Sequence, residues 1–283
     1  ERGAAFRKLH ESGCFVIPNP SNVGEAKRLA KLGFKAIASS SAGAAWMLGK
    51  QDGELTCEEV LSHLRDLVAA TDLPVNADFE NGFADAPDAV AANVTRAIAT
   101  GVAGLSIEDT TLPVPHAAAK APPMLTIEEG VGKMKAALAG RRDPALVIAG
   151  RTSAPLLSSV EDAIARATAY EAVGVDAIFL VGIKSKEQLE AISRATSKPL
   201  ILGTAPASMM DRTYLAAQRV RICLQGHLPF QAAIQAQYLV LKALRDGIMP
   251  AEIKGLPSPE LVRTVTRAAD YDRWLKDWLG GQP

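Results

Sequence analysis

Short apolar runs recur along the chain at regular intervals, and longer amphipathic stretches separate one run from the next. The apolar runs cover residues 14–18, 36–40, 74–79, 104–108, 146–151, 177–181, 199–203 and 220–226. Each is apolar almost throughout, which is typical of parallel strands buried on both faces. The stretches at 22–32, 56–70, 86–100, 126–139, 159–173 and 186–194 have the spacing of amphipathic helices. Eight strand–helix units in succession predict a (β/α)8 barrel, the TIM-barrel fold.

Residues suited to helix ends flank the predicted helices. Ser21, Thr56 and Thr126 each precede an acidic residue near the first turn, as N-cap residues do. Glycines such as Gly140 and Gly174 end helical patterns, where the left-handed conformation of a C-cap favours glycine. The local chemistry therefore agrees with the periodicity.

A doubly wound nucleotide-binding sheet is the main alternative to the barrel. It normally has fewer strands, and the sequence contains neither a GxGxxG segment after the first strand nor a GxxxxGK[ST] loop. We therefore expect one barrel domain over residues 1–283, with residues 247–283 as a C-terminal helical extension. Trp274 and Trp278 lie four residues apart, on one face of a helix in this extension. That face packs either on its own barrel or on a neighbouring subunit.

The composition excludes several classes of function. The 283 residues include 31 Lys and Arg and 31 Asp and Glu, so no overall charge attracts nucleic acid or an anionic membrane. No apolar stretch reaches the roughly 18 residues that a transmembrane helix requires. The three cysteines are widely spaced without a CxxC pair, and the N-terminus lacks the layout of a signal peptide. We therefore expect a protein of the reducing cytoplasm, with no nucleic-acid or membrane partner.

Polar side chains gather at the carboxyl ends of five predicted strands. They are the serines at 39–41, residues 76–80, the acidic pair at 108–109, Arg151 with Thr152, and residues 225–227, which end in a histidine. In a TIM barrel the active site lies at this end of the strands. Carboxylates from different strands, without companion His or Cys ligands, favour a hard cation such as Mg²⁺ over Zn²⁺. An arginine beside such an ion suits a reaction in which negative charge develops on a substrate oxygen, as in an enolate.

The polar runs also resemble those of a known family, the phosphoenolpyruvate mutase/isocitrate lyase superfamily. The resemblance covers residues 6–246 and rests on SSS at 39–41 with GKQD at 49–52, NADFENGF at 76–83, SIEDT at 106–110 and GRT at 150–152. It implies a (β/α)8 barrel that binds Mg²⁺, with Mn²⁺ as the alternative ion, and a small 2-oxo acid. It also implies a last helix exchanged between paired subunits, and a homotetramer built as a dimer of dimers.

Matching to the family's motifs assigns the acidic positions around the metal to Asp52, Asp78 and Glu108, and Glu108 is also one of the catalytic groups. The third-strand motif departs from the usual Asp-x-Asp, because its first position is Asn76 and Glu80 follows Asp78. An Asn ligand brings no charge and weakens Mg²⁺ binding, and Glu80 can restore that charge. We expect Glu80 among the metal ligands and Asn76 in substrate binding. Which of these two contacts the ion stays open.

The same matching assigns substrate binding to the start of the second strand–helix connection. Ser40, Ser41 and Ala42 correspond to the segment that holds the substrate carboxylate. Arg151 corresponds to the arginine that contacts the enolate oxygen or a carboxylate, so the resemblance implies both a binding and a catalytic role for it.

Local likeness is greatest to the oxaloacetate decarboxylase branch of the superfamily. It rests on IEDT at 107–110, EEGVGK at 128–133, RDPAL at 142–146, LVG at 180–182 and GH at 226–227. This branch implies decarboxylation of oxaloacetate to pyruvate and CO₂ through an enolate, which is a carbon–carbon lyase reaction. His227 would act as a catalytic residue by organising the water that protonates the enolate.

Other members of the superfamily leave alternatives open. Lyases of isocitrate or methylisocitrate carry a cysteine acid/base on the loop after the fourth strand, but the loop at 111–125 contains none. A carbon–carbon lyase of a substituted malate that works without this cysteine is one alternative. A carbon–phosphorus mutase or hydrolase is another, supported only by Lys120 on the same loop, which also carries His116. A last alternative is that the protein is not an enzyme but a catalytically silent barrel that binds an oxo acid. In that case Asn76, in place of the usual Asp, would be a sign that activity was lost.

Overall fold

The computed structural model describes residues 1–111, 123–203, 205–224 and 226–280. Contacts within it divide the chain into two compact units, Glu1–Leu228 and Pro229–Pro283. The extension expected from the sequence began at residue 247, whereas this division falls at the start of the long helix that precedes that position. The first unit contains the barrel, and the described part of the second contains only helices.

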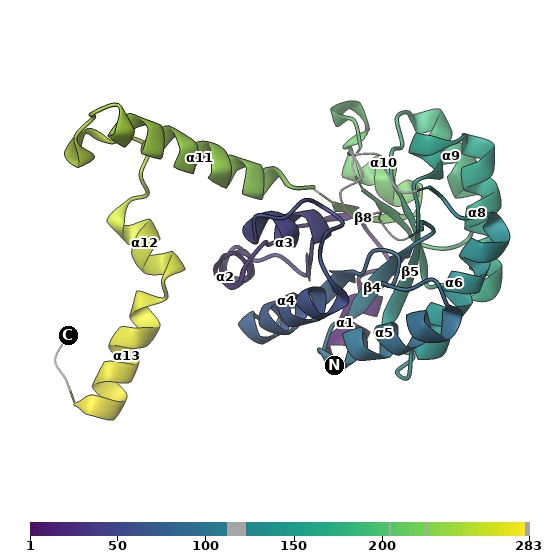
Figure 1. Cartoon of the computed structure of the whole chain (residues 1–283), viewed down its shortest axis with the longest axis horizontal. Coiled ribbons are helices and arrows are strands. Elements are labelled where there is room, and N and C mark those ends of the chain that lie inside the picture. The colour runs from purple at the N-terminus through teal and green to yellow at the C-terminus, as the bar shows by residue number, and fades with distance from the viewer. Residues whose placement is uncertain (112–122, 204, 225, 281–283) are drawn as a thin grey trace. The chain divides into compact units, whose positions relative to one another are not determined.

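A single parallel sheet runs through the first unit (Figure 1). Its eight strands, all within the described residues, are β1 (Phe15–Ile17), β2 (Ile37–Ala38), β3 (Val75–Asp78), β4 (Gly104–Glu108), β5 (Val147–Thr152), β6 (Ala177–Leu180), β7 (Leu200–Leu202) and β8 (Val220–Leu224). Hydrogen-bonded neighbours follow the order β1-β8-β7-β6-β5-β4-β3-β2. At the remaining gap the Ala38 amide donates to the Pro18 carbonyl at 2.9 Å, which joins β2 to the end of β1. The sheet is a nearly closed barrel, and the predicted fold class is confirmed.

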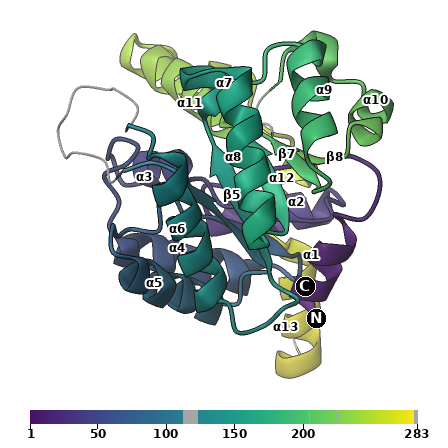
Figure 2. The ribbon, with the colours of Figure 1, turned by 90° about the vertical axis from the view of Figure 1, so that its right-hand side faces the viewer.

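Helices connect the strands and cover the outer face of the sheet, except for α1, which precedes β1. In the described part of the first unit they are α1 (Arg2–Lys8), α2 (Val23–Lys31), α3 (Ser41–Met47), α4 (Cys57–Ala70), α5 (Pro87–Ala99), α6 (Ile127–Gly140), α7 (Ala154–Leu157), α8 (Val160–Val173), α9 (Lys186–Ala195), α10 (Arg212–Ala217) and the 3₁₀ turn η1 (Ala207–Met209). Helices α5, α6 and α8 pack side by side along the outside (Figure 2). The sequence pattern predicted the long helices but missed the short ones, α1, α3, α7 and α10.

The second strand is shorter than predicted. The apolar run extended to residue 40, but β2 ends at Ala38. Ser40 is already the N-cap of α3, where its Oγ accepts a hydrogen bond from the Gly43 amide at 3.0 Å. The serine run is therefore a strand-to-helix junction, which places Ser41 at the first residue of α3.

The predicted N-caps are correct at two positions and wrong at one. Thr56 and Thr126 each form a capping box with the glutamate three residues on. At α2 the N-cap is Asn22, whose side chain accepts from the Glu25 amide at 3.0 Å. Ser21 lies one residue too early, and its amide donates to the Glu25 carboxylate at 2.6 Å instead.

Of the two glycines predicted to cap the C-terminal ends of helices, one is a cap and the other is not. Gly174 caps α8 in the left-handed conformation with φ 97°, as predicted. Gly140 is the last residue of α6 rather than its cap. A Cβ at this position would run into the carbonyl oxygen of Ala91 on α5, so Gly140 allows the two helices to approach closely.

Two apolar layers pack against the two faces of the sheet. Inside the barrel, small side chains such as Ala38 and Ala149 pack with Phe179, and Phe6 of α1 packs with them. Gly104 makes room for Phe6, because a Cβ there would lie 2.8 Å from Cε1 of that ring. Outside, strand side chains pack against the helices in a larger cluster. Because the interior is filled, the carboxyl ends of the strands are the place where a ligand can meet the polar side chains.

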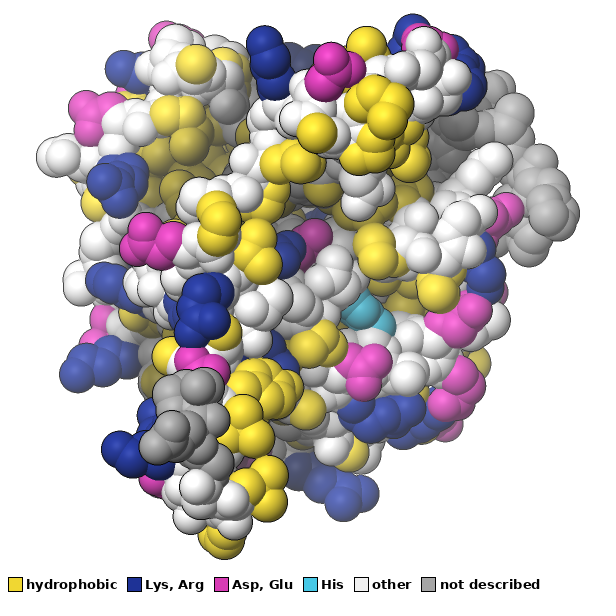
Figure 3. All heavy atoms as spheres, turned by 90° about the vertical axis from the view of Figure 1, so that its left-hand side faces the viewer, with side chains coloured by type: hydrophobic (Ala, Val, Ile, Leu, Met, Phe, Trp, Pro, Cys, Tyr) yellow, Lys and Arg dark blue, Asp and Glu magenta, His cyan; other side chains and the backbone are white. Residues whose placement is uncertain are grey.

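The second unit consists, in its described part, of α11 (Leu228–Arg245), the 3₁₀ turn η2 (Pro250–Glu252), α12 (Pro259–Val265) and α13 (Ala268–Leu279). Large hydrophobic side chains lie exposed on these helices (Figure 3), among them Leu241 at 66% and Trp278 at 81%. No helix among the described residues is both long enough and apolar enough to cross a bilayer.

Candidate active site

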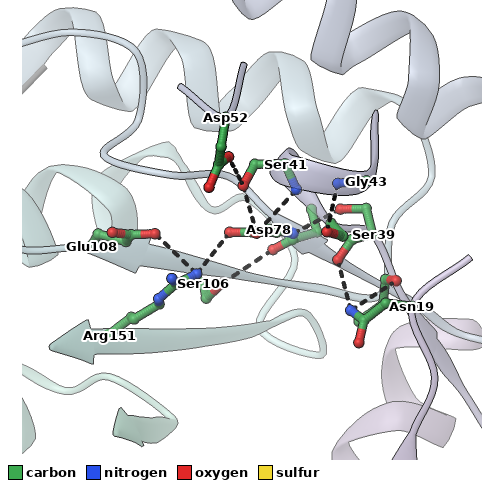
Figure 4. Close-up of polar contacts among 12 residues, drawn as sticks. Asn19, Ser39, Ser41, Gly43, Asp52, Asp78, Ser106, Glu108 and Arg151 are labelled. Carbon is green, nitrogen blue, oxygen red and sulfur yellow. Dashed lines mark hydrogen bonds and ion pairs between the residues drawn. The ribbon is translucent and has the colours of Figure 1, made fainter. Parts of the chain in front are cut away.

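Three charged side chains meet at the carboxyl ends of β3, β4 and β5 (Figure 4). Nη1 of Arg151 lies 3.0 Å from Oδ1 of Asp78 and 2.9 Å from Oε1 of Glu108. The strand register explains this meeting, since Glu108 and Arg151 are direct partners in the β4–β5 pair. The guanidinium also lies over the Phe179 ring, 5.0 Å from its centroid. Burial opposes charge on Arg151, but the carboxylates of Glu108 and Asp78 outweigh it and raise the pKa of the guanidinium.

The start of α3 fixes the other oxygen of Asp78. Ser41 donates to Oδ2 of Asp78 from its amide at 3.2 Å and from its hydroxyl at 3.1 Å. The same hydroxyl lies 3.1 Å from Oδ1 of Asp52, on the loop after α3. The Asp78 amide in turn donates to Oγ of Ser39 at 2.8 Å. The β2–α3 junction therefore holds Asp78 in place and brings Asp52 beside it.

Glu80 lies just beyond the end of β3, in the left-handed region with φ 44°. Its side chain is buried, and its Oε1 atom has no hydrogen-bond partner in the part of the chain that the structure describes. Burial, followed by the carboxylates of Asp78 and Asp52, raises the pKa of Glu80 to about 8. A strained backbone and an unpaired buried oxygen are costly, and such features are typical of functional sites.

The acidic groups of this cluster crowd one another. Burial raises the pKa of Glu108, with Arg151 opposing the shift and Asp78 reinforcing it. Partial burial and the Asp78 carboxylate also raise the pKa of Asp52. Within the described cluster, four carboxylates face one arginine. A bound cation would favour the charged forms that burial and mutual repulsion disfavour here.

The donor set suits Mg²⁺ with a partly hydrated shell. Among residues 1–111, 123–203, 205–224 and 226–280, no three or more His, Cys, Asp or Glu side chains converge closely enough to hold a metal ion. The assignment of Asp52, Asp78, Glu80 and Glu108 as ligands stays a prediction. Mg²⁺ usually keeps several waters and takes only one or two carboxylates directly. Oxygen donors, including the unpartnered Oε1 of Glu80, fit an ion of this kind.

His227 approaches the same junction from the segment after β8. Its Nδ1 atom lies 3.1 Å from Oγ of Ser40. The imidazole also makes an edge contact with Trp46 on α3, with the ring centroids 4.9 Å apart. The structure therefore brings Ser40, Ser41, Asp52, Asp78, Glu108, Arg151 and His227 together around the start of α3 and the ends of β3 to β5.

Among the described residues, the side chains of Asn76 and Ala42 take no part in these polar contacts. Asn76 lies two residues before Asp78 on β3, so its side chain points into the barrel one layer deeper. A Cβ added at Gly104 would lie 2.9 Å from Oδ1 of Asn76, next to the ring of Phe6. Asn76 thus belongs to the filling of the barrel rather than to its rim. Ala42 is buried in the first turn of α3.

Sequence reasoning missed one polar residue of this region, Asn19. It is buried after β1 and donates from Nδ2 to the carbonyls of Ala38 at 3.3 Å and Ser39 at 3.0 Å, which holds the end of β2 (Figure 4). The signal was present, because Asn19 directly follows the predicted strand at 14–18, at the same end as the other polar residues. His116 and Lys120 lie outside the described residues.

Comparison with known proteins gives consistent matches. The model of the phosphoenolpyruvate phosphomutase family matches residues 6–245. The oxaloacetate decarboxylase of Bradyrhizobium sp. (strain ORS 278) is 48% identical over 267 residues, which cover 93% of this chain and 92% of that protein. Oxaloacetate acetylhydrolase, solved in complex with the product oxalate, superposes with a TM-score of 0.84 at 26% identity and covers 99% of both chains. Phosphonopyruvate hydrolase, solved with oxalate and Mg²⁺, has a TM-score of 0.84 at 25% identity, covering 98% of this chain and 99% of that one.

The barrel carries carboxylates, hydroxyls and an arginine at the carboxyl ends of its strands. This arrangement is typical of α/β-barrel enzymes. The chain belongs to the phosphoenolpyruvate phosphomutase family. The resemblance identified from the sequence motifs is therefore confirmed.

Proposed function

We propose that this chain decarboxylates oxaloacetate to pyruvate and CO₂ with the help of Mg²⁺. The observation that carries the proposal is the Arg151 guanidinium held between Asp78 and Glu108, within a surplus of crowded carboxylates. The 48% identity to an oxaloacetate decarboxylase over most of the chain supports this substrate. Relatives whose structures hold oxalate, one of them with Mg²⁺, support a site for the same two-carbon core.

The carboxylates would hold the ion. Asp78 lies at the centre of the contacts, and Asp52, Glu80 and Glu108 surround it, so we assign these four to the metal, some of them through water. When bound, Mg²⁺ polarises the C2 carbonyl of the substrate and stabilises the negative charge that develops there. Mn²⁺ has the same preference for oxygen ligands and can take its place.

Arg151 contacts the oxygen on which charge develops as CO₂ leaves from C4. Its Nη1 atom is fixed by Asp78 and Glu108, so the guanidinium is oriented before the substrate arrives. Its Nε atom is buried without a hydrogen-bond partner among the described residues, a cost that is typical of functional sites. A pre-oriented donor costs no reorganisation at the moment of reaction.

The start of α3 binds the substrate carboxylate and positions the acid. Ser40 and Ser41 bring their hydroxyls to the site, and we assign Ala42, which follows them in the first turn of α3, to the same carboxylate-binding segment. Ser40 also connects to His227, whose imidazole would organise the water that protonates the enolate carbon. Asn76, one layer deeper, would shape the floor of the site rather than bind an ion.

We also propose a homo-oligomer, a dimer of dimers, joined through the second unit. Tyr238, Leu241 and Trp278 are each more than half exposed there, and burial against a second copy removes this apolar surface from water. The proposed compartment is the cytoplasm. The sulfur atoms of Cys14 and Cys223 lie 3.8 Å apart as free thiols, which suits a reducing environment.

Product analysis tests the proposed activity. Carbon-13 oxaloacetate is followed by NMR with the purified chain in Mg²⁺, in Mn²⁺ and in EDTA. We expect pyruvate and CO₂ with either ion, and no enzymatic turnover in EDTA. An Asp78→Asn variant at the same concentration corrects for decarboxylation of oxaloacetate by the ion alone. Oxalate and acetate as products would contradict decarboxylation, and turnover of phosphonopyruvate but not oxaloacetate would assign carbon–phosphorus chemistry.

A further inference from the structure

A buried polar network lies behind the site, on the outer side of the barrel wall. Asp109 directly follows Glu108, and its side chain is fully buried. Oδ2 of Asp109 accepts hydrogen bonds from the Tyr170 hydroxyl at 2.6 Å and from Nη1 of Arg166 at 2.9 Å. Arg166 and Tyr170 both belong to α8, and both are buried. We call Asp109, Arg166 and Tyr170 the Asp109 network.

Tyr170 also contacts the strand that carries Arg151. A Cβ added at Gly150 would lie 3.2 Å from Cδ2 of the Tyr170 ring, and a Cβ at Gly130 on α6 would run into its hydroxyl. The ring therefore occupies space left by two missing side chains. Gly150 immediately precedes Arg151, just as Asp109 immediately follows Glu108. One tyrosine thus contacts the chain next to both members of the ion pair.

The backbone completes this connection. The Asp109 amide donates to the Arg151 carbonyl at 3.1 Å, between the ends of β4 and β5. The Asp109 carbonyl accepts from the Leu125 amide at 2.8 Å, and Lys133 donates from Nζ to the Thr110 carbonyl at 3.2 Å. Asp109 and Thr110 are therefore held by neighbouring segments, and the register of the ion pair is fixed from behind.

Stability alone does not account for such a network. Buried ion pairs lose much of their Coulomb energy to desolvation, and well-packed hydrophobic residues of the same volume are often as stable or more so. Tyr170 itself packs within the large apolar cluster between the strands and the helices. What a hydrogen-bonded network adds is a defined orientation, because its contacts are directional.

We propose that Tyr170 is a positioning residue for the decarboxylation, acting through Asp109 and Gly150 to hold Glu108 and Arg151 in their mutual geometry. The proposal rests on the proposed function. Outer-shell groups that orient groups of an active site commonly contribute about 10–100-fold to activity. The hydroxyl of Tyr170 supplies one of the two side-chain hydrogen bonds that Asp109 accepts from the described residues, so its loss loosens the network without removing the ring that fills the space at Gly150.

The test compares Tyr170→Phe with Tyr214→Phe, a matched control. The Tyr214 hydroxyl donates to Oε1 of Glu190 on α9 at 3.2 Å, and neither residue belongs to the Asp109 network. For Tyr170→Phe we expect kcat for oxaloacetate to fall about 10-fold with KM nearly unchanged. For Tyr214→Phe we expect wild-type kcat. Both variants are assayed well below their melting temperatures, and circular dichroism confirms that each is folded.

A double-mutant cycle separates positioning from general support of the fold. If Tyr170 acts through the ion pair, Tyr170→Phe should have little further effect on kcat in a Glu108→Gln background. Wild-type kcat in Tyr170→Phe, or the same loss in both backgrounds, would overturn the proposal. A wild-type chain without activity on oxaloacetate would instead overturn the proposed function, so the two failures are distinct.

Discussion

Replacement of Glu80 by glutamine should change how the stability of the metal-free protein depends on pH. The Glu80 side chain is buried, and burial together with Asp78 raises the pKa of its carboxyl to about 8, from an ordinary value of 4.5. The folded state therefore binds this proton more tightly than the unfolded chain does. The carboxyl costs no stability below pH 4.5, and the free energy of unfolding falls as the pH rises from 4.5 to 8.

The size of the effect follows from the difference between the two pKa values. Each pH unit inside this window costs about 1.4 kcal/mol, so at pH 7 the wild-type carboxyl costs about 3 kcal/mol of folding free energy. Glu80→Gln keeps the shape of the protonated side chain and has no proton to lose, so it removes this cost. For a chain of this size the melting temperature at pH 7 should rise by roughly 6–10 °C.

Urea unfolding in EDTA at several pH values between 5 and 8, followed by circular dichroism, measures this difference. Glu128→Gln, at an exposed position in the first turn of α6, serves as the matched control. The stability gap between Glu80→Gln and wild type should widen as the pH rises, while the control stays parallel to wild type. A gap that does not change with pH would refute the reasoning. Added Mg²⁺ should narrow the gap, because a bound cation stabilises the carboxylate.

Three further changes test other parts of the molecule. Arg151→Lys should lower kcat by about 10²–10³ with little change in KM, because an ammonium lacks the planar fork that reaches two oxygens; near-normal turnover, with a lowered melting temperature in Arg151→Ala, would leave the residue a purely structural role. Asp78→Ala should abolish Mg²⁺-dependent turnover in the NMR assay, and an unchanged kcat with unchanged Mg²⁺ dependence would remove Asp78 from the metal site. Truncation after residue 256 should reduce the subunit number measured by light scattering, since it deletes Trp274 and Trp278; a stable particle of unchanged subunit number would count against the proposed interface.

The barrel could be predicted because its strands are buried on both faces and so read as separate apolar runs. Each of the eight runs overlaps a strand, and most strands differ from their runs by one or two residues at an end. The shortening of β2 is an example, since the Ser40 hydroxyl caps α3. The helix α3 itself escaped prediction because its Ala-rich and Gly-containing sequence has no amphipathic period.

The sequence predicted which polar residues gather at the site, because the carboxyl ends of parallel strands meet at one end of a barrel. The sequence did not predict as reliably how deep in the barrel a given side chain lies. Asn76 and Asp78 are two residues apart and point the same way, yet only Asp78 reaches Arg151. The pairing of Asp109 with Tyr170 is separated by 61 residues, and no local pattern indicates a contact at that range.

The aromatic ring of Phe6 at the closed end of the barrel determines how substrate enters and products leave. With Phe6 and Phe179 in the packed interior, the barrel is a cup with one mouth and not a tube. Whatever reacts at the rim must leave by the opening through which it arrived. A two-carbon anion seated at that mouth would therefore block entry of the substrate and departure of the products alike.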